Sequence, residues 1–430
     1  MDSATNMILY RNLGQGQIFG NMTWIMEHYG SEFYNREDVR SLCYESFHDL
    51  IELSASHGFE GNLWHDYLTY LMVDNENAYS TACEIRGRVS GSINELARHD
   101  FAIFMELFAF DFGKLIEGLD MPELAVLSDY RRSGQNGKVF NHRIRDRICS
   151  LSVRLEQAAT VEEFQAEVTD FYREFGVGKL GLHKAFRIEH EGQGAKIVPI
   201  ANIAHVHLSD LVGYELAKQK LLANTEAFVQ GKQANNCLLF GDAGTGKSSS
   251  IKAIINQYYS QGLRMIEVYK HQFQDLNSVI SQIKNRNYKF IIYMDDLSFE
   301  EFEIEYKYLK AVIEGGLEKK PDNVLIYATS NRRHLVREKF SDKQERDDEL
   351  HTNDTVQEKL SLVSRFGVTI YFGAPDKKEY HNIVKNLAET NQIQMETQML
   401  LSEADRWELN HGGRSGRTAQ QFINYLLGKQ

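Results

Sequence analysis

Residues 238–250 read LLFGDAGTGKSSS, and this stretch decides the fold of the chain around it. It matches the pattern GxxxxGK[ST], with Gly241, Gly246, Lys247 and Ser248 at the defining positions. An apolar run precedes the glycines and a helical pattern follows them. Glycines let the backbone turn its N–H groups toward phosphates, the lysine supplies a cation, and the serine hydroxyl suits Mg²⁺. The stretch therefore predicts a strand, a phosphate-binding loop and a helix. The candidate nucleotide-binding residues of this loop are Gly241, Asp242, Ala243, Gly244, Thr245, Gly246, Lys247, Ser248 and Ser249.

A second stretch, IIYMDDLSFE at 291–300, places two aspartates at the end of an apolar strand. Such a pair is a weak signal alone, but here it follows the loop by one strand–helix unit. We expect Asp295 to join Ser248 in holding Mg²⁺, and Asp296 to face the γ-phosphate as the catalytic acid–base residue. Many phosphate-hydrolysing enzymes have glutamate second. Aspartate is one methylene shorter than glutamate, but a bridging water or a closer strand can make up the lost reach. Glu300 or Glu301 either assists Asp296 or is a solvated helix residue.

Strands alternate with helices after residue 235, which predicts βαβ units and a parallel sheet. The expected fold is α/β, with a five-stranded parallel sheet flanked by helices. The strands are expected at 236–240, 263–270, 289–296, 323–330 and 367–372, and the helices between them at 248–261, 275–285 and 303–318.

Three polar residues beyond the aspartates are candidate catalytic groups. Asn331 follows the fourth strand and is expected to hold the attacking water, with Thr329 and Ser330 behind it, although a simple strand-to-turn transition also fits. Arg365 precedes the fifth strand and is either an arginine that reaches a neighbouring subunit's γ-phosphate or a solvated surface residue. Arg417 lies in the first turn of a helix that Ser415 is expected to cap, and a cation there suggests an anionic partner. Arg414 competes for that role.

The rest of the chain divides into helical and irregular parts. Residues 1–175 show helical spacing and dense aromatic side chains, which we expect to fill a helical core. Residues 176–210 are expected to form a linker, where GVGKLG formally matches GxGxxG but follows a helix instead of a strand. The nucleotide-binding domain is expected at 211–375 and a helical lid at 376–430.

Composition limits the partners and the compartment. The chain has 430 residues and a formal net charge of −12, which disfavours a broad electrostatic contact with nucleic acid or an anionic membrane. Its four cysteines are far apart and signal neither zinc nor redox chemistry. The N-terminus lacks a basic region followed by an apolar core. We expect a cytoplasmic protein with no membrane partner.

The ordered motifs resemble those of the AAA+ ATPase superfamily. Within it, the segments ANNCLLFGDAGTGKSS, YMDDLSFE, YATSNRRHL, SRFG and GGRSGRTAQQF look like a bacterial AAA-type ATPase family catalogued only as a domain of unknown function. The resemblance implies ATP and Mg²⁺ as cofactors, and an adenine-contacting segment at Val212, Gly213 and Tyr214. It also implies a homo-oligomer in which Arg365 acts in trans. Where unfoldases carry an aromatic–hydrophobic–glycine loop, this chain reads VYKHQFQDL; Tyr269 or Phe273 could serve, but no glycine follows.

The leading hypothesis is an ATP-binding and slowly ATP-hydrolysing protein that remodels a partner recognised by residues 1–175. A nucleotide-gated switch with little turnover is the main alternative, because Asp296 is short. A small-molecule or nucleotide kinase is a third hypothesis, which the separate C-terminal helices and Arg365 count against. Nucleic-acid binding is possible but not favoured, and the basic positions to test for it are Arg332, Arg333, Lys307 and Lys310.

Overall fold

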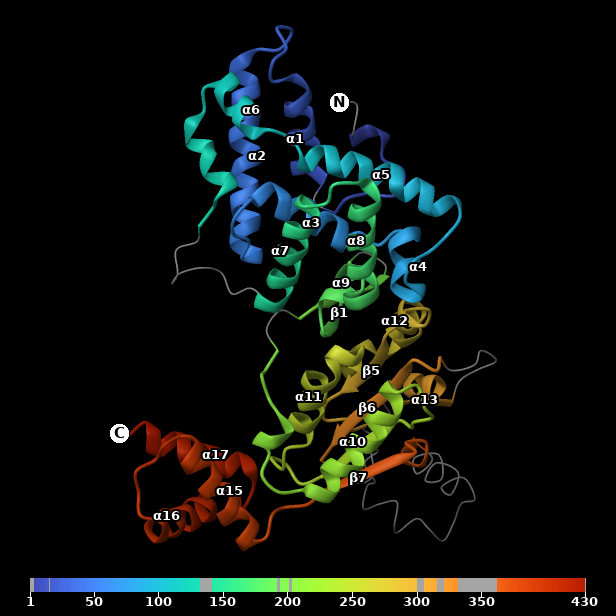
Figure 1. Ribbon diagram of the computed structural model, residues 1–430. Coiled ribbons are helices and arrows are strands. Elements are labelled where there is room, and N and C mark those ends of the chain that lie inside the picture. The colour runs from blue at the N-terminus through green and yellow to red at the C-terminus, as the bar shows by residue number, and fades with distance from the viewer. Residues whose placement is uncertain are drawn as a thin grey trace. The chain divides into compact units, whose positions relative to one another are not determined.

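The computed structural model (Figure 1) describes residues 4–14, 16–131, 141–191, 194–200, 203–299, 305–314, 321–331 and 362–429. The chain divides into two compact units, Met1–His183 and Lys184–Gln430.

The first unit is helical in its described residues. Its elements are η1 (Ala4–Asn6), α1 (Gly16–His28), α2 (Arg36–His57), α3 (Leu63–Asp74), α4 (Ala78–Arg86), α5 (Ser92–Phe108), α6 (Phe112–Leu119), η2 (Pro122–Ser128), α7 (His142–Glu156), α8 (Val161–Phe175) and α9 (Gly178–Leu182). Asparagine side chains accept hydrogen bonds from the first-turn backbone N–H groups of several of these helices, which explains where they begin. These caps are Asn35, Asn62, Asn77 and Asn141.

Aromatic side chains fill the core of this unit, as the sequence predicts. Tyr10, Phe101, Phe104 and Tyr172 are each at most 2% exposed. The Tyr10 and Tyr172 hydroxyls lie 2.8 Å apart, so the buried phenols satisfy each other. The buried carboxylate of Asp100 accepts hydrogen bonds from the backbone N–H groups of residues 8–10, at 2.7–3.1 Å. The N-terminal segment is therefore held to α5 by several hydrogen bonds to one buried carboxyl group.

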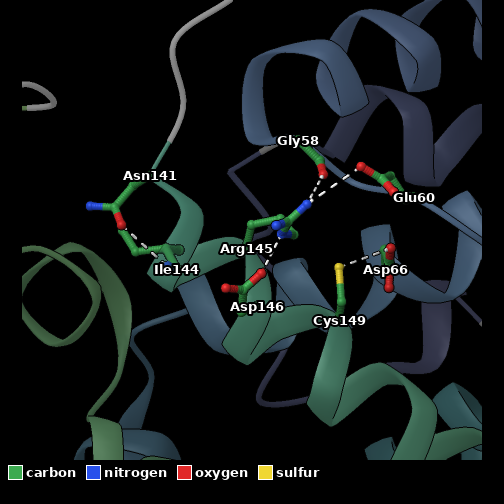
Figure 2. A network of polar contacts seen from close by, with 8 residues as sticks. All are labelled: Gly58, Glu60, Asp66, Asn141, Ile144, Arg145, Asp146 and Cys149. Atoms are coloured by element: carbon green, nitrogen blue, oxygen red, sulfur yellow. Dashed lines mark hydrogen bonds and ion pairs between the residues drawn. The ribbon is translucent and has the colours of Figure 1, made fainter. Parts of the chain in front are cut away.

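A polar network joins α7 to α3 and to the loop before it (Figure 2). The Arg145 guanidinium donates to the Gly58 carbonyl at 3.5 Å and to the Glu60 carboxylate at 3.4 Å. The Cys149 thiol donates to Asp66 Oδ2 at 3.4 Å. Burial is the main cause that raises the pKa of Asp66, to about 6. This network places an ionisable carboxyl inside the helical unit.

The second unit contains a seven-stranded sheet in the order β2-β1-β4-β5-β6-β3-β7. Its strands are β1 (Ala185–Glu191), β2 (Gly194–Pro199), β3 (Cys237–Gly241), β4 (Leu263–Glu267), β5 (Lys289–Met294), β6 (Val324–Ser330) and β7 (Val368–Phe372). Its helices before β7 are η3 (Leu208–Asp210), α10 (Glu215–Val229), α11 (Lys247–Tyr258), η4 (Tyr259–Gln261), η5 (Lys270–Asp275), α12 (Leu276–Ile283) and α13 (Glu305–Glu314). β6 is buried along its whole length, as expected for a central strand of a parallel sheet.

The prediction of a five-stranded, wholly parallel sheet is wrong. β1 pairs antiparallel with β2 and parallel with β4, so the sheet has two further strands and is mixed. Both strands come from 176–210, where we expected a linker. Their short, glycine-flanked runs resemble loop sequence, and only the exposed edge of β4 gives them a pairing partner. All other neighbouring strands pair in parallel.

Three helices follow the sheet: α15 (Lys377–Thr390), α16 (Thr397–Asn410) and α17 (Gly416–Leu427). They share a small apolar core that includes Tyr380, Ala404 and Phe422. Asp376 begins α15, and Ser415 begins α17 by accepting the Thr418 N–H at 3.0 Å, which confirms the predicted cap. These helices form a compact group with its own core. Among the helices within the described ranges, none is both long and apolar enough to cross a membrane.

Candidate functional site

The glycine-rich loop joins β3 to α11 at the carboxyl end of the sheet. Gly241, Gly244 and Gly246 have φ angles of 135°, 74° and 92°, in the region that favours glycine. A Cβ on Gly241 would lie 2.1 Å from the Phe372 carbonyl oxygen on β7. The loop therefore requires glycine both for its backbone conformation and for its close approach to the neighbouring strand.

Lys247 begins α11 and points back into the loop. Its ammonium group donates to the carbonyls of Gly241, at 2.9 Å, and Asp242, at 2.6 Å. Burial lowers its pKa, and the carboxylates of Asp242, Asp296 and Asp295 oppose that shift. The loop thus holds a buried cation beside the backbone N–H groups at the N-terminal end of a helix, an arrangement that suits an anion.

Asp295 follows β5 and meets the loop serine. The Ser248 hydroxyl donates to Asp295 Oδ1 at 2.7 Å, and the Thr329 hydroxyl donates to the same oxygen at 2.6 Å. Partial burial raises the pKa of Asp295, but these hydrogen bonds outweigh it, and the pKa lies below its ordinary value. A hydroxyl and an ionised carboxylate held this close are the hard oxygen ligands that Mg²⁺ prefers, so the residues fit that ion.

Asp296 is held in an unusual backbone conformation, with a φ of 50°. Its N–H donates to Thr329 Oγ1 at 2.9 Å, and its Oδ1 accepts the Asn331 amide at 2.8 Å. Thr329 therefore contacts both aspartates. From the sequence, Thr329 was expected only to stand behind Asn331, and the signal that could have identified its role is the polar tip ATSN after a buried strand.

These groups line a cavity of about 540 Å³. The predicted site residues among its walls are Val212, Tyr214, Ala243, Gly244, Thr245, Gly246, Lys247, Ser248, Ser249, Asp295, Asp296, Asn331 and Arg417. Ile383, Leu387 and Gln420 of the C-terminal helices also line it, and sequence reasoning missed them. Ile383 and Leu387 look like ordinary core positions of a helix and Gln420 looks like an ordinary surface position, so nothing in the sequence marks them as cavity walls.

The predicted adenine segment binds the start of α15. The Tyr214 N–H donates to Glu379 Oε1 at 3.3 Å, and its hydroxyl donates to the Gly373 carbonyl at 3.0 Å. A Cβ on Gly213 would lie 2.4 Å from Glu379 Oε1, so glycine lets the two segments approach. Gly213 itself does not line the cavity, whereas Val212 and Tyr214 do.

The structure separates the three candidate arginines. Arg417 lines the cavity, and its N–H donates to the Gly244 carbonyl at 3.1 Å. Arg414 instead donates to the nearly buried carboxylate of Glu408 at 3.0 Å. Arg365 is exposed and lies outside the cavity walls.

The remaining acidic, basic and aromatic residues singled out from the sequence do not line the cavity or lie outside the described residues. Glu300, Glu301, Arg332 and Arg333 lie outside the described residues, whereas Lys307 and Lys310 lie on α13. Tyr269 is 48% exposed and Phe273 is buried, so only the tyrosine is accessible of the two aromatic candidates. Within the part of the chain that the structure describes, no three His, Cys, Asp or Glu side chains gather as a metal-binding group.

A protein-family model, described as "Protein of unknown function (DUF815)", matches residues 181–430, more than half of the chain. The chain belongs to this family. That membership confirms the resemblance to a family catalogued as a domain of unknown function. No curated protein matches the chain.

Solved structures of low similarity also match this DUF815 member. A mutant of Thermotoga maritima RuvB is 18% identical, with a TM-score of 0.36, over 51% of this chain and 64% of that one. The chain thus spans less than two thirds of that relative. The T. maritima RuvB Holliday junction branch migration motor is 15% identical, with a TM-score of 0.32, over 51% and 71% of the two chains. The FIGL-1 AAA domain in complex with ADP is 16% identical, with a TM-score of 0.36, over 53% and 75%.

Proposed function

We propose that this DUF815 protein is an AAA+-type ATPase that binds ATP with Mg²⁺ and hydrolyses it slowly. One observation carries the proposal. An unbroken series of hydrogen bonds runs from Ser248 through Asp295 and Thr329 to Asp296 and Asn331, beside the glycine-rich loop. Such an arrangement presents a cation site and a water-orienting carboxylate to the same phosphate group.

The loop binds the phosphates in this proposal. The loop N–H groups and the Lys247 ammonium contact the β- and γ-phosphates, so the ammonium exchanges its two backbone carbonyl partners for phosphate oxygens. Ser248 and Asp295 would hold Mg²⁺, which would neutralise charge that develops on the phosphates. The carboxylates of Asp295 and Asp296 would repel the phosphates, so phosphate binding would depend on charge neutralisation by Mg²⁺.

Asp296 is the residue that we assign to the attacking water. Asn331 holds one of its carboxylate oxygens at 2.8 Å, and the other oxygen accepts a water proton. The backbone at a φ of 50° turns this short carboxylate toward the cavity, which compensates for the missing methylene of glutamate.

The base of the nucleotide is assigned to the wall formed by Val212, Tyr214, Ile383 and Leu387, which offers apolar surface beside polar backbone. Arg417 supplies a cation to the phosphates from α17. Because α15 and α17 both contribute to the cavity, we assign residues 376–430 the role of a lid whose position depends on the bound nucleotide.

Arg365 is assigned to a neighbouring subunit's site. It is exposed and outside its own cavity walls, so it acts in trans in a homo-oligomer. The helical unit, residues 1–175 in our domain division, is assigned to recognition of a protein partner. Phe33, in the turn between α1 and α2, is 97% exposed and is the first residue to test there.

The test combines assembly with turnover. Mass measurement of the full chain with and without ATP and Mg²⁺ should show nucleotide-dependent assembly, alongside slow release of phosphate. Lys247→Ala should abolish ATP binding, while Lys232→Ala, an exposed lysine after α10, should not change it. Arg365→Ala should leave ATP binding intact but reduce assembly and turnover. Wild-type protein that binds no nucleotide would refute the proposal.

A nucleotide-gated switch is the second candidate function. It is favoured by the Asn331 amide, which already occupies one oxygen of the short Asp296 carboxylate. Asp296→Asn separates the two functions, because it should retain ATP binding and abolish turnover in an ATPase. If wild-type turnover is at background while ATP binds tightly, the switch is the correct function.

A further inference from the structure

Tyr293 lies on β5 directly below the proposed Mg²⁺ site. It precedes Asp295, the first residue after the strand, by two residues, and the two side chains interact on one face of the sheet. That face is covered by α11, and Tyr293 packs in one apolar cluster with Ile251 and Ile255 of that helix. Only 2% of Tyr293 is exposed. Its phenol is therefore enclosed between the sheet and the helix that begins at Lys247.

The Tyr293 hydroxyl lies close to Ser248 and Asp295, but among the described residues it makes no hydrogen bond of normal geometry. Leaving a buried hydroxyl unpaired is unfavourable, because it loses its hydrogen bonds to water on folding. The polar side chains that interact with it are Ser248 and Asp295. A phenol carries its proton near neutral pH, so the hydroxyl is available as a donor.

Tyr327 provides a matched comparison within the same sheet. It lies opposite Tyr293 in the β5–β6 register, belongs to the same apolar cluster and is 0% exposed. Its hydroxyl accepts the Asn224 amide at 2.9 Å and lies 2.9 Å from the Thr225 hydroxyl. The fold thus satisfies one buried phenol and leaves its neighbour unsatisfied next to Ser248 and Asp295.

We propose that Tyr293 is a positioning residue, and that its hydroxyl donates a hydrogen bond to the Asp295 carboxylate when Mg²⁺ and nucleotide are bound. The inference rests on the proposed nucleotide function. Asp295 already accepts from Ser248 and Thr329 on Oδ1. A third donor, from the Tyr293 hydroxyl, orients the carboxylate. Residues that do not contact a metal commonly orient its ligands through hydrogen bonds in this way. The unpaired hydroxyl costs stability in the folded chain and gains its partner only at the loaded site.

The experiment compares Tyr293→Phe with Tyr327→Phe in the full chain. Each variant removes one oxygen atom and preserves the ring. ADP affinity is measured by calorimetry across a Mg²⁺ titration and in EDTA, and the urea midpoint of unfolding is measured in the absence of nucleotide. For Tyr293→Phe we expect an unfolding midpoint no lower than wild type, and unchanged ADP affinity in EDTA. The Mg²⁺ concentration that gives half of the affinity gain should rise about tenfold.

Tyr327→Phe should show the opposite pattern, with a lower unfolding midpoint and an unchanged Mg²⁺ response, because its hydroxyl is bonded within the fold. An unchanged Mg²⁺ response in Tyr293→Phe overturns the inference alone, as does an unfolding midpoint lowered as far as in Tyr327→Phe. Weaker ADP binding in EDTA also overturns it, because the residue would then act on the nucleotide pocket. Wild-type protein that binds no ADP under any condition overturns both the inference and the proposed function.

Discussion

Thr329→Val should uncouple the two aspartates of the site without changing the volume of the side chain. Thr329 is 2% exposed, and its hydroxyl donates to Asp295 Oδ1 at 2.6 Å and accepts the Asp296 N–H at 2.9 Å. Losing a donor to a charged group costs about 1.5–3 kcal/mol, and leaving an N–H without its acceptor costs about 1–3 kcal/mol. Both aspartates are exposed, so water replaces part of each bond. We therefore expect the variant to lose about 2–3 kcal/mol of unfolding free energy.

The same substitution should change the ionisation of the site. The Thr329 hydrogen bond is the largest influence that lowers the pKa of Asp295, so its removal should raise that pKa. Urea unfolding measures the stability, and the pH dependence of Mg²⁺–ADP affinity measures the carboxylate. Thr369→Val, at an exposed position of β7, is the control and should change stability by less than about 0.5 kcal/mol. If Thr329→Val matches this control in both assays, the proposed coupling through Thr329 is wrong.

Asp66, the two C-terminal arginines and Gly241 can each be tested by substitution. The folded chain binds the Asp66 proton more tightly than the unfolded chain, because its pKa is about 6 instead of 3.8. Stability should therefore fall by about 2 kcal/mol as pH rises from 4 to 6, and Asp66→Asn should remove that slope in urea unfolding. Arg417→Ala should weaken ADP binding in calorimetry, whereas Arg414→Ala should leave it unchanged and cost about 1 kcal/mol of stability; equal affinities in the two variants would contradict the assignment. Gly241→Ala should lower the urea midpoint, at a cost of about 1–3 kcal/mol, because its Cβ would collide with β7, and an unchanged midpoint would show that the strand yields.

The strands that carry the site could be predicted because each has its own local signal. β3 and β5 are short apolar runs followed by glycines or aspartates, and their parallel pairing brings those ends to one edge of the sheet. β1 and β2 could not be predicted, since their sequences are polar and glycine-flanked and become strands only through pairing with β4 and each other.

Local sequence also could not show which of the two C-terminal arginines, Arg414 or Arg417, lines the cavity. Arg414 and Arg417 are three residues apart, and spacing alone does not decide which one reaches the cavity. The choice is made by Glu408 on α16, whose nearly buried carboxylate pairs with Arg414. An ion pair between neighbouring helices is a tertiary contact, so no local pattern reveals it.

The sequence by itself determined the chemistry of this protein's site: a glycine-rich loop with Lys247 and Ser248, and an acidic pair after a buried strand. These features are local, because backbone conformation and side-chain type specify them within a few residues. Only the tertiary structure decided that Thr329 bonds both aspartates and that the Tyr293 hydroxyl, near them, makes no hydrogen bond of normal geometry within the described residues. Hydrogen bonding between strands depends on register and on the helix that covers them, and residues distant in the chain set both.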